Sequence, residues 1–283
     1  MKELLRWGIE ELSEAEIPTA KLDAEVLLGA VLGLTRSQVL ARSHTPMQRH
    51  QRGRFAALIQ RRKRGEPVAY ILGRQEFYGR EFLVDRRVLI PRPETEELVD
   101  HCLNALEGRV TPRVADIGTG SGAIAITIAA ERADAVVLAS DVSSGALGVA
   151  RENAQRYTSE GRIDFRQGSL LDPLAGATPL DLIVANLPYV GTSEIDILAA
   201  DVRDYEPHEA LFAGPEGLDL FPLLFEQLRD HALLKPDGAL WLEMGYAQGA
   251  ALARMARLYF PNAHKVAVHT DLAHHDRFVE LNP

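Results

Sequence analysis

The segment Ile183–Val190, IVANLPYV, has the clearest potential for chemistry. Its apolar residues are typical of a buried strand, which ends abruptly at Asn186, Leu187, Pro188 and Tyr189. The Asn186 side-chain carbonyl and the next main-chain carbonyl are two acceptors that can hold both N–H groups of a flat carboxamide. The Tyr189 ring can stack on such an amide and support charge that develops on its nitrogen. The segment therefore predicts a site where a planar nitrogen is held while a group is transferred to it.

The predicted chemistry needs no general base. An amide nitrogen is a poor nucleophile because its lone pair is delocalised into the carbonyl, and two acceptors can turn that lone pair toward an electrophilic methyl group. The amide proton need not leave first, because its acidity rises once the nitrogen is methylated. No histidine or carboxylate stands beside the motif in the sequence. The alternative is structural: Asn186 would cap a turn, and Pro188 would only block strand pairing.

A glycine-rich loop supplies the second constellation. The stretch VADIGTGSGAIAI lies between a predicted strand and a predicted helix, where bare backbone lets a ligand approach and the helix start offers free N–H groups. Asp141 ends the next predicted strand, where a carboxylate can accept both hydroxyls of a ribose. The candidate cofactor residues of the loop are Asp116, Gly118, Thr119, Gly120, Ser121 and Gly122.

The loop alone does not decide which nucleotide binds. It also satisfies the Gly-x-Gly-x-x-Ala form used for dinucleotides. Asp116 favours an amino-acid-bearing cofactor such as S-adenosylmethionine, since an acid would repel a pyrophosphate and could receive an ammonium group. In RQGSLLD, Ser169 and Leu170 are the expected neighbours of the adenine, although these residues could simply end a strand.

The elements that position these residues alternate between strand and helix from Arg113 onward. This alternation predicts an α/β fold with a doubly wound, seven-stranded, mostly parallel sheet. The last two strands are separated by a few residues and should pair antiparallel at one edge. The predicted strands are residues 113–118, 135–141, 162–168, 180–186, 238–245, 264–271 and 277–282.

The first part of the chain has a different character. Residues 1–75 show helical spacing of apolar residues, residues 76–94 alternate as a β-hairpin or extended linker, and a helix should open near Pro93. We expect three segments: a helical partner-recognition domain at 1–75, the linker at 76–94, and a cofactor-binding domain at 95–283. Residues 207–217 are expected to cover the substrate entrance, with Glu206, Pro207 and Glu209 left outside the predicted site.

Composition limits the partners. The net charge of −9 argues against direct DNA binding, and no apolar run is long enough to predict a membrane span. The single cysteine, Cys102, cannot form an internal disulfide, which fits a cytoplasmic protein. No metal site is predicted, because His264 and His269 would point to opposite faces of one strand. One basic cluster stands out in the helical segment, either as a solvated face or as a docking surface: Arg49, Arg52, Arg54, Arg61, Arg62, Lys63 and Arg64.

These stretches resemble class I S-adenosylmethionine-dependent methyltransferases of the amino type, and more narrowly the bacterial release factor glutamine methyltransferases of the HemK/PrmC family. The most specific element is LIPRPETE; YEPHEALFAGPEGLDLF and DLAHHDRFVEL also match, and the resemblance covers nearly the whole chain. It implies methyl transfer to the glutamine side-chain nitrogen in the Gly-Gly-Gln motif of class 1 peptide chain release factors, with S-adenosylhomocysteine as product. By matching position, residues 118–122 and Asp141 would hold the cofactor, and Asn186–Tyr189 would hold the glutamine. Asn186 is also expected to contact the cofactor, since it would lie at the mouth of the cofactor site.

Two departures and several alternatives remain. The family usually has proline at Leu187, whose carbonyl nevertheless remains available, and many relatives have an acid and an aromatic residue at Ser169 and Leu170. A ribosomal protein glutamine methyltransferase is a close alternative, although such enzymes typically have serine where Pro93 stands. An adenine-DNA methyltransferase shares the tetrapeptide but fits poorly, because the net charge is −9 and no target-recognition domain is evident. An NAD(P)-dependent dehydrogenase has no reason to end its fourth strand with this tetrapeptide. An inactive binding module fits less well, since the loop and the tetrapeptide are both intact.

Overall fold

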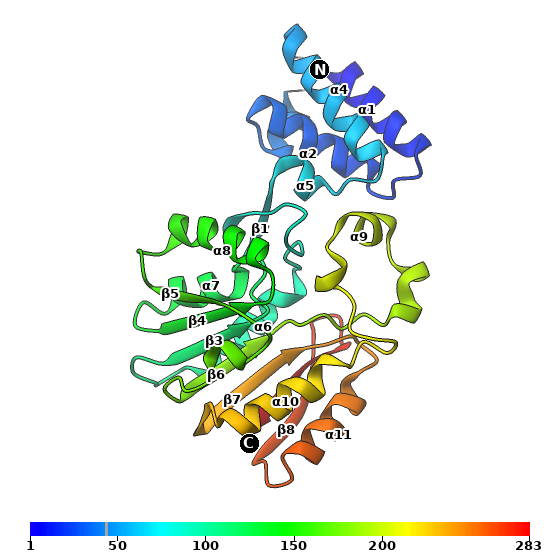
Figure 1. Cartoon of the computed structure of the whole chain (residues 1–283). Helices are drawn as coiled ribbons and strands as arrows, with labels where there is room; N and C mark the ends of the chain where they lie inside the picture. The colour runs from blue at the N-terminus through cyan, green and yellow to red at the C-terminus, as the bar shows by residue number, and fades with distance from the viewer. Residues whose placement is uncertain (43–44) are drawn as a thin grey trace. The chain divides into compact units, whose positions relative to one another are not determined.

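The structure, a computed structural model, describes residues 1–42 and 45–283, which form two compact units (Figure 1). The helical unit comprises Met1–Arg74 together with Ala199–Tyr205. The sheet unit comprises Gln75–Leu198 together with Glu206–Pro283. This division differs from the predicted one in two respects: the linker belongs to the sheet unit, and a short segment from the second half of the chain belongs to the helical unit.

The helical unit is built around α2, whose sequence AKLDAEVLLGAVL is mostly apolar and ends at Gly33 in the left-handed region (φ 66°). Leu27 and Leu28 of α2 are fully buried and pack with Phe55 and Ile59 of α4. The helices of this unit are α1 (Lys2–Glu14), α2 (Ala20–Leu32), α3 (Arg36–Ala41), α4 (Arg49–Lys63), α5 (Val68–Leu72) and α9 (Ala200–Tyr205).

Polar contacts explain why α9 joins the helical unit. The buried Arg62 guanidinium donates from Nε to Asp23 Oδ2 at 2.7 Å and from Nη2 to Asp201 Oδ2 at 3.3 Å. The Tyr205 hydroxyl donates to the main-chain carbonyl of Arg64 at 2.8 Å. A buried guanidinium needs such partners, and nothing in the local pattern of α9 predicts that it supplies one.

Ion pairs within the helical unit reduce the basic cluster that the sequence indicates. Arg61 pairs with Glu66, Arg62 with Asp23, and Lys63 with Glu11. These three cations are committed to contacts within the helical unit. The cluster is thus smaller than the sequence indicates, and its exposed members are Arg49, Arg52, Arg54 and Arg64.

The sheet unit confirms the predicted fold class. Its seven strands run in the order β5-β4-β3-β6-β7-β9-β8; β9 is antiparallel to both β7 and β8, and the other neighbours are parallel (Figure 1). β1 and β2 form a separate two-stranded hairpin. The strands are β1 (Arg74–Phe77), β2 (Arg80–Leu83), β3 (Arg113–Ile117), β4 (Val136–Asp141), β5 (Ile163–Gln167), β6 (Leu180–Ala185), β7 (Leu234–Glu243), β8 (Lys265–Thr270) and β9 (Asp276–Asn282).

Both faces of the sheet are covered, as an apolar strand requires. All six residues of β6 are buried; Leu182 and Val184 belong to one core cluster, while Ile183 and Ala185 belong to the other. The alternation follows from the two-residue repeat of a strand. The helices of this unit are α6 (Glu94–Ala105), α7 (Ala123–Glu131), α8 (Ser144–Tyr157), α10 (Leu220–His231) and α11 (Gly249–Tyr259), with short 3-10 helices η1 (Asp172–Leu174), η2 (Thr192–Ile197) and η3 (His208–Ala210).

The strand β7 begins at Leu234, four residues earlier than its predicted start at Gly238. The residues between contain Pro236, Asp237 and Gly238, which normally indicate a turn. Here they form an irregularity, because Leu180 pairs with Leu234 while Leu182 already pairs with Ala239. In the part of the chain that the structure describes, no helix has the length and apolar character needed to cross a membrane.

Candidate active site

The glycine loop leads from the end of β3 into the start of α7. Gly118, Gly120 and Gly122 have φ values of 71°, 56° and 81°, a region that side chains other than glycine rarely occupy. A Cβ at Gly122 would lie 2.7 Å from Ile126 Cδ1, so this glycine serves close packing of the helix. A Cβ at Gly120 would meet only the Gly118 carbonyl at 4.0 Å, and Gly120 lines the pocket, so its bare backbone leaves room for a ligand.

Asp116 lies beneath the loop. Its Oδ2 accepts the Thr119 hydroxyl at 2.6 Å and the Ala125 backbone N–H at 3.1 Å, while its buried Oδ1 has no partner among the described residues. Burial raises the pKa of Asp116 to about 7. The residue supports the loop and the first turn of α7, and it is not among the residues that line the pocket. The predicted contact with an ammonium group stays a prediction.

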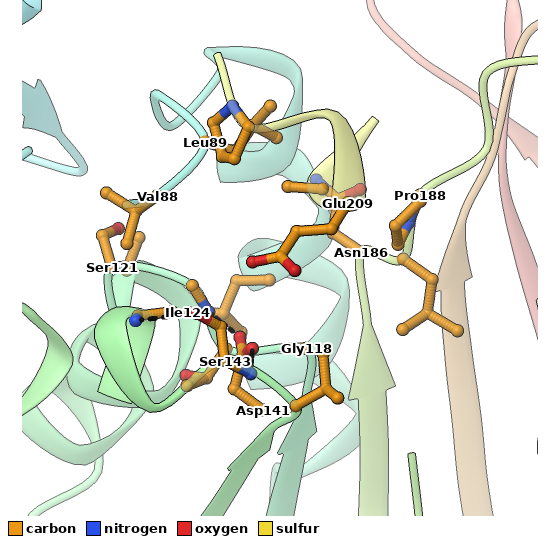
Figure 2. A pocket seen from close by; sticks show the side chains of 18 of the residues that line it. Val88, Leu89, Gly118, Ser121, Ile124, Asp141, Ser143, Asn186, Pro188 and Glu209 are labelled. Carbon is orange, nitrogen blue, oxygen red and sulfur yellow. Dashed lines mark hydrogen bonds between the residues drawn. The ribbon is translucent and has the colours of Figure 1, made fainter. Parts of the chain in front are cut away.

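Asp141 ends β4 and faces the pocket directly. Its Oδ2 accepts the Gly120 N–H at 2.9 Å, and its Oδ1 accepts the Ser143 N–H at 2.9 Å (Figure 2). These bonds fix the carboxylate and leave further lone pairs on both oxygens. Burial raises the pKa of Asp141, and the negative charge of Glu209 also contributes. The geometry suits a carboxylate that accepts the hydroxyls of a ribose.

Ser169 and Leu170 also line the pocket, on the turn after β5. Leu170 has φ 49°, and its carbonyl accepts the Ser140 hydroxyl at 2.9 Å. Ser140 belongs to β4, and its own carbonyl accepts the N–H groups of Gly118 and Thr119. The turn and the glycine loop are thus anchored to the same residue, which brings the predicted adenine and loop contacts to one side of the cavity.

The tetrapeptide Asn186–Tyr189 directly follows the end of β6. Asn186 donates from Nδ2 to the Thr95 hydroxyl at 3.1 Å, and within the described residues neither Asn186 Oδ1 nor the Leu187 main-chain carbonyl accepts a hydrogen bond. Asn186, Leu187 and Pro188 line the pocket. Two unused acceptors therefore occur in consecutive residues at its wall, as expected for a carboxamide clamp.

The Leu187 side chain has a packing role that could not be predicted from the proline that the family usually has at this position. The side chain is 3% exposed, lies in the core cluster, and would come within 3.2 Å of a Cβ at Gly118. It therefore packs directly over the glycine loop. The leucine links the two predicted site segments through an apolar contact, in addition to supplying its carbonyl.

Tyr189 is placed differently from the other three residues. Its hydroxyl donates to Glu243 Oε1 at 3.3 Å, and its ring is not part of the pocket lining in the described chain. Burial and the Glu243 charge raise the pKa of Tyr189, so it stays a neutral phenol. Stacking of Tyr189 on a substrate amide stays a prediction.

Two residues beside the tetrapeptide were missed by the sequence reasoning. Thr95, in the first turn of α6, donates its hydroxyl to Glu243 Oε2 at 2.8 Å, and both residues are buried. Glu243 ends β7. A carboxylate therefore lies near the motif in space, although none lies near it in the sequence. One signal was present, because Glu243 is a lone acid at the end of the apolar run GALWLEMG.

The sequence predicts that residues 207–217 cover the substrate entrance, but it leaves Glu206, Pro207 and Glu209 outside the predicted site. Pro207 and Glu209 line the pocket, and the buried Glu206 carboxylate accepts the Ile90 N–H at 3.0 Å and pairs with Arg92, itself a lining residue. Glu206 thus joins the segment after α9 to the LIPRPETE segment. The pocket has a volume of about 430 Å³, and Figure 2 shows the Glu209 carboxylate directed into it. This volume is typical of a site for a small organic cofactor.

Comparison with known proteins decides the family. Residues 3–73 match the family model "PrmC N-terminal domain", and residues 95–202 match "Methyltransferase small domain". A release factor glutamine methyltransferase from Nitratidesulfovibrio vulgaris is 39% identical over 277 residues, which cover 98% of this chain and 92% of the relative. The chain belongs to the release factor glutamine methyltransferase family. The family predicted from the motifs is therefore confirmed, and the chain is a methyltransferase.

Other members and a solved structure agree. The release factor glutamine methyltransferase of Koribacter versatilis is 40% identical over 87% of each chain. A crystal structure of a methyltransferase from Pyrococcus furiosus, 16% identical, covers 80% of this chain and 96% of its own with a TM-score of 0.51. At that identity the structural likeness supports the fold alone, which is the methyltransferase sheet described above.

Proposed function

We propose that this chain transfers a methyl group from S-adenosylmethionine to the side-chain nitrogen of the Gly-Gly-Gln glutamine in class 1 peptide chain release factors. The observation that carries the proposal is the pair of unused acceptors, Asn186 Oδ1 and the Leu187 carbonyl, at the wall of a pocket that also contains the glycine loop. The names of the most similar relatives point to the same substrate.

The residues present fit this cofactor. The open backbone at Gly120 leaves space for it, the fixed carboxylate of Asp141 would hold its ribose, and Ser169 and Leu170 would lie near its base. When bound, S-adenosylmethionine supplies an electrophilic methyl group on a positively charged sulfur. The Glu209 carboxylate adds negative charge to the same cavity, which favours a cationic ligand.

The protein contributes orientation rather than proton removal. Asn186 Oδ1 and the Leu187 carbonyl would each accept one N–H of the substrate amide and turn its lone pair toward the methyl group. As the new N–C bond forms and the S–C bond breaks, positive charge develops on the nitrogen. The same two oxygens stabilise that charge, and the methylated nitrogen then releases a proton to water.

Mass spectrometry tests the proposal. Purified release factor incubated with the enzyme and S-adenosylmethionine should gain one methyl group on the Gly-Gly-Gln glutamine. A release factor with alanine at that glutamine should gain none, and the Asn186→Ala enzyme is the second control. Methylation of ribosomal protein but not of release factor would favour the close alternative. Binding of NAD but not of S-adenosylhomocysteine would exclude methyl transfer.

We also propose that the helical unit recognises the release factor, in the cytoplasm where termination takes place. The exposed Arg49, Arg52 and Arg54 lie on α4, and the cofactor residues all lie in the sheet unit. Reversing these three charges to glutamate in the full chain should raise the KM for release factor and leave the Kd for S-adenosylhomocysteine unchanged. An unchanged KM would place recognition elsewhere.

A further inference from the structure

The orientation of the Asn186 amide matters because its two ends have opposite hydrogen-bonding character. The carbonyl oxygen accepts, and the NH2 group donates. Only an amide with Oδ1 toward the pocket can accept an N–H of the substrate. A flip about the terminal side-chain bond would present donors to donors, so some part of the protein must hold the amide in the productive orientation.

A chain of hydrogen bonds connects Asn186 to two buried residues, Thr95 and Glu243. Asn186 Nδ2 lies 3.1 Å from Thr95 Oγ1, and Thr95 Oγ1 lies 2.8 Å from Glu243 Oε2. Glu243 is 1% exposed and Thr95 is 4% exposed. The second carboxylate oxygen, Oε1, accepts the Tyr189 hydroxyl at 3.3 Å. Four side chains from α6, β7 and the tetrapeptide thus form one network.

The polarity of this network is determined by its carboxylate. An ionised Glu243 can only accept, so the single hydroxyl proton of Thr95 must point toward it. The lone pairs of Thr95 then face Asn186, which must donate a hydrogen bond to them from its NH2 group. Asn186 Oδ1 is consequently left toward the pocket, where it accepts no bond within the described residues.

We propose that Glu243 and Thr95 are positioning residues that hold the Asn186 amide with its oxygen toward the substrate, and that the ionised form of Glu243 maintains this polarity. The inference rests on the proposed function, because it assigns a role to two residues behind the proposed amide clamp. Neither residue is required to exchange a proton with the substrate.

The surroundings of Glu243 make its charge responsive to pH. Burial raises its pKa to about 7, against the lowering effects of the Thr95 hydrogen bond, the Arg277 charge on β9 and the Tyr189 hydroxyl, while Glu94 on α6 adds a repulsive charge. Above that pH the carboxylate only accepts. Below it, a protonated Glu243 can donate to Thr95, which frees the Thr95 proton to point at Asn186 and reverses the amide. Turnover should therefore fall as the pH drops through about 7.

The test compares kcat against pH for the wild-type enzyme and three variants. Thr95→Val removes the hydroxyl and should lower kcat by about 10-fold or more, the order expected when a reacting group loses its orientation. KM and the Kd for S-adenosylhomocysteine should change little. Thr95→Ser keeps a hydroxyl, so its kcat should be close to that of the wild type. It should also show the acid limb of the profile, which is the fall in kcat as the pH drops through about 7. Glu243→Gln, which cannot ionise, should show no acid limb near pH 7.

A matched control comes from Thr127 on α7, which is also fully buried and whose hydroxyl has no partner among the described residues. Thr127→Val makes the same chemical change away from the site and should leave kcat and its pH profile as in the wild type. If Thr95→Val matches the Thr127→Val control, the inference is overturned. An acid limb in Glu243→Gln identical to that of the wild type also overturns it.

Two further outcomes are distinguishable. A wild-type enzyme that methylates no release factor refutes the proposed function itself. If Thr95→Val does not fold, as judged by loss of S-adenosylhomocysteine binding, the Glu243→Gln profile decides the matter alone. A simple structural role for Glu243 would lower stability without removing the acid limb.

Discussion

Glu206 provides a sharp test of how the pocket is assembled. Its buried carboxylate accepts the Ile90 N–H and pairs with Arg92, so it connects two segments that line the cavity from distant parts of the sequence. Glu206→Ala removes both interactions and leaves a buried N–H without its acceptor. Glu206→Gln keeps a neutral acceptor for Ile90 and loses the ion pair with Arg92, because an NH2 group replaces the oxygen that accepts from Arg92.

The magnitude follows from these contacts. An unsatisfied buried N–H costs about 1–3 kcal/mol, and a hydrogen bond to a charged group contributes about 1.5–3 kcal/mol. Because the Arg92 side chain is 31% exposed, its ion pair with Glu206 contributes a free energy at the low end of the second range. We expect Glu206→Ala to lower the free energy of unfolding by about 2–4 kcal/mol and Glu206→Gln by about 1–2 kcal/mol.

Urea denaturation measures the free energy of unfolding, which should decrease in the order wild type, Glu206→Gln, Glu206→Ala. Glu160→Ala is the control, since Glu160 is an exposed glutamate. A second measurement is the Kd for S-adenosylhomocysteine. Binding to the alanine variant should be about 10-fold weaker if the ligand must reorder the lining segments at a cost of about 1.4 kcal/mol. Equal stability of the alanine variant and the wild type would refute the role of Glu206. Equal stability of the two variants would refute the contribution of the Ile90 hydrogen bond, and a glutamine variant as stable as the wild type would refute the contribution of the ion pair with Arg92.

Three further outcomes are expected. Asn186→Ala should lower kcat by about 10²-fold or more, as for loss of a transition-state acceptor, and leave the Kd for S-adenosylhomocysteine within a few-fold by calorimetry; near-wild-type turnover would remove Asn186 from the mechanism. Asp141→Ala should weaken that Kd by about 10- to 100-fold, and an unchanged Kd would place the ribose elsewhere. Asn153→Ala deletes one bond accepted from Leu83 N–H and two donated to the Leu83 and Ser121 carbonyls. It should lower the free energy of unfolding by about 2–4 kcal/mol, and a urea midpoint equal to that of the wild type would show that these bonds contribute little.

Most of the sheet was predictable because its signal is local. The mostly apolar β6 and the alternation of strands with helices indicate a covered parallel sheet, and the glycine loop and Asp141 lie where a nucleotide-binding sheet requires them. The pocket lining includes Asn186, Leu187, Pro188, Ser169 and Leu170, all named from the sequence.

The rest depended on contacts between residues far apart in the chain. Thr95 and Glu243 are 148 positions apart, and Ile90 and Glu206 are 116 apart. No spacing rule connects such pairs, since each meets only after the sheet has formed. The placement of Tyr189 against Glu243 has the same cause, because a local motif does not determine which way a ring turns at the end of a strand.

The return of α9 to the helical unit has a practical consequence for anyone who divides this enzyme. A fragment that starts at Gln75 would retain Asp201 and Tyr205 without Arg62 and Arg64, and a fragment that stops at Arg74 would lose those partners. No single cut yields two intact pieces. Chimaeras between relatives should therefore exchange residues 1–74 and 199–205 together, as one graft in two segments.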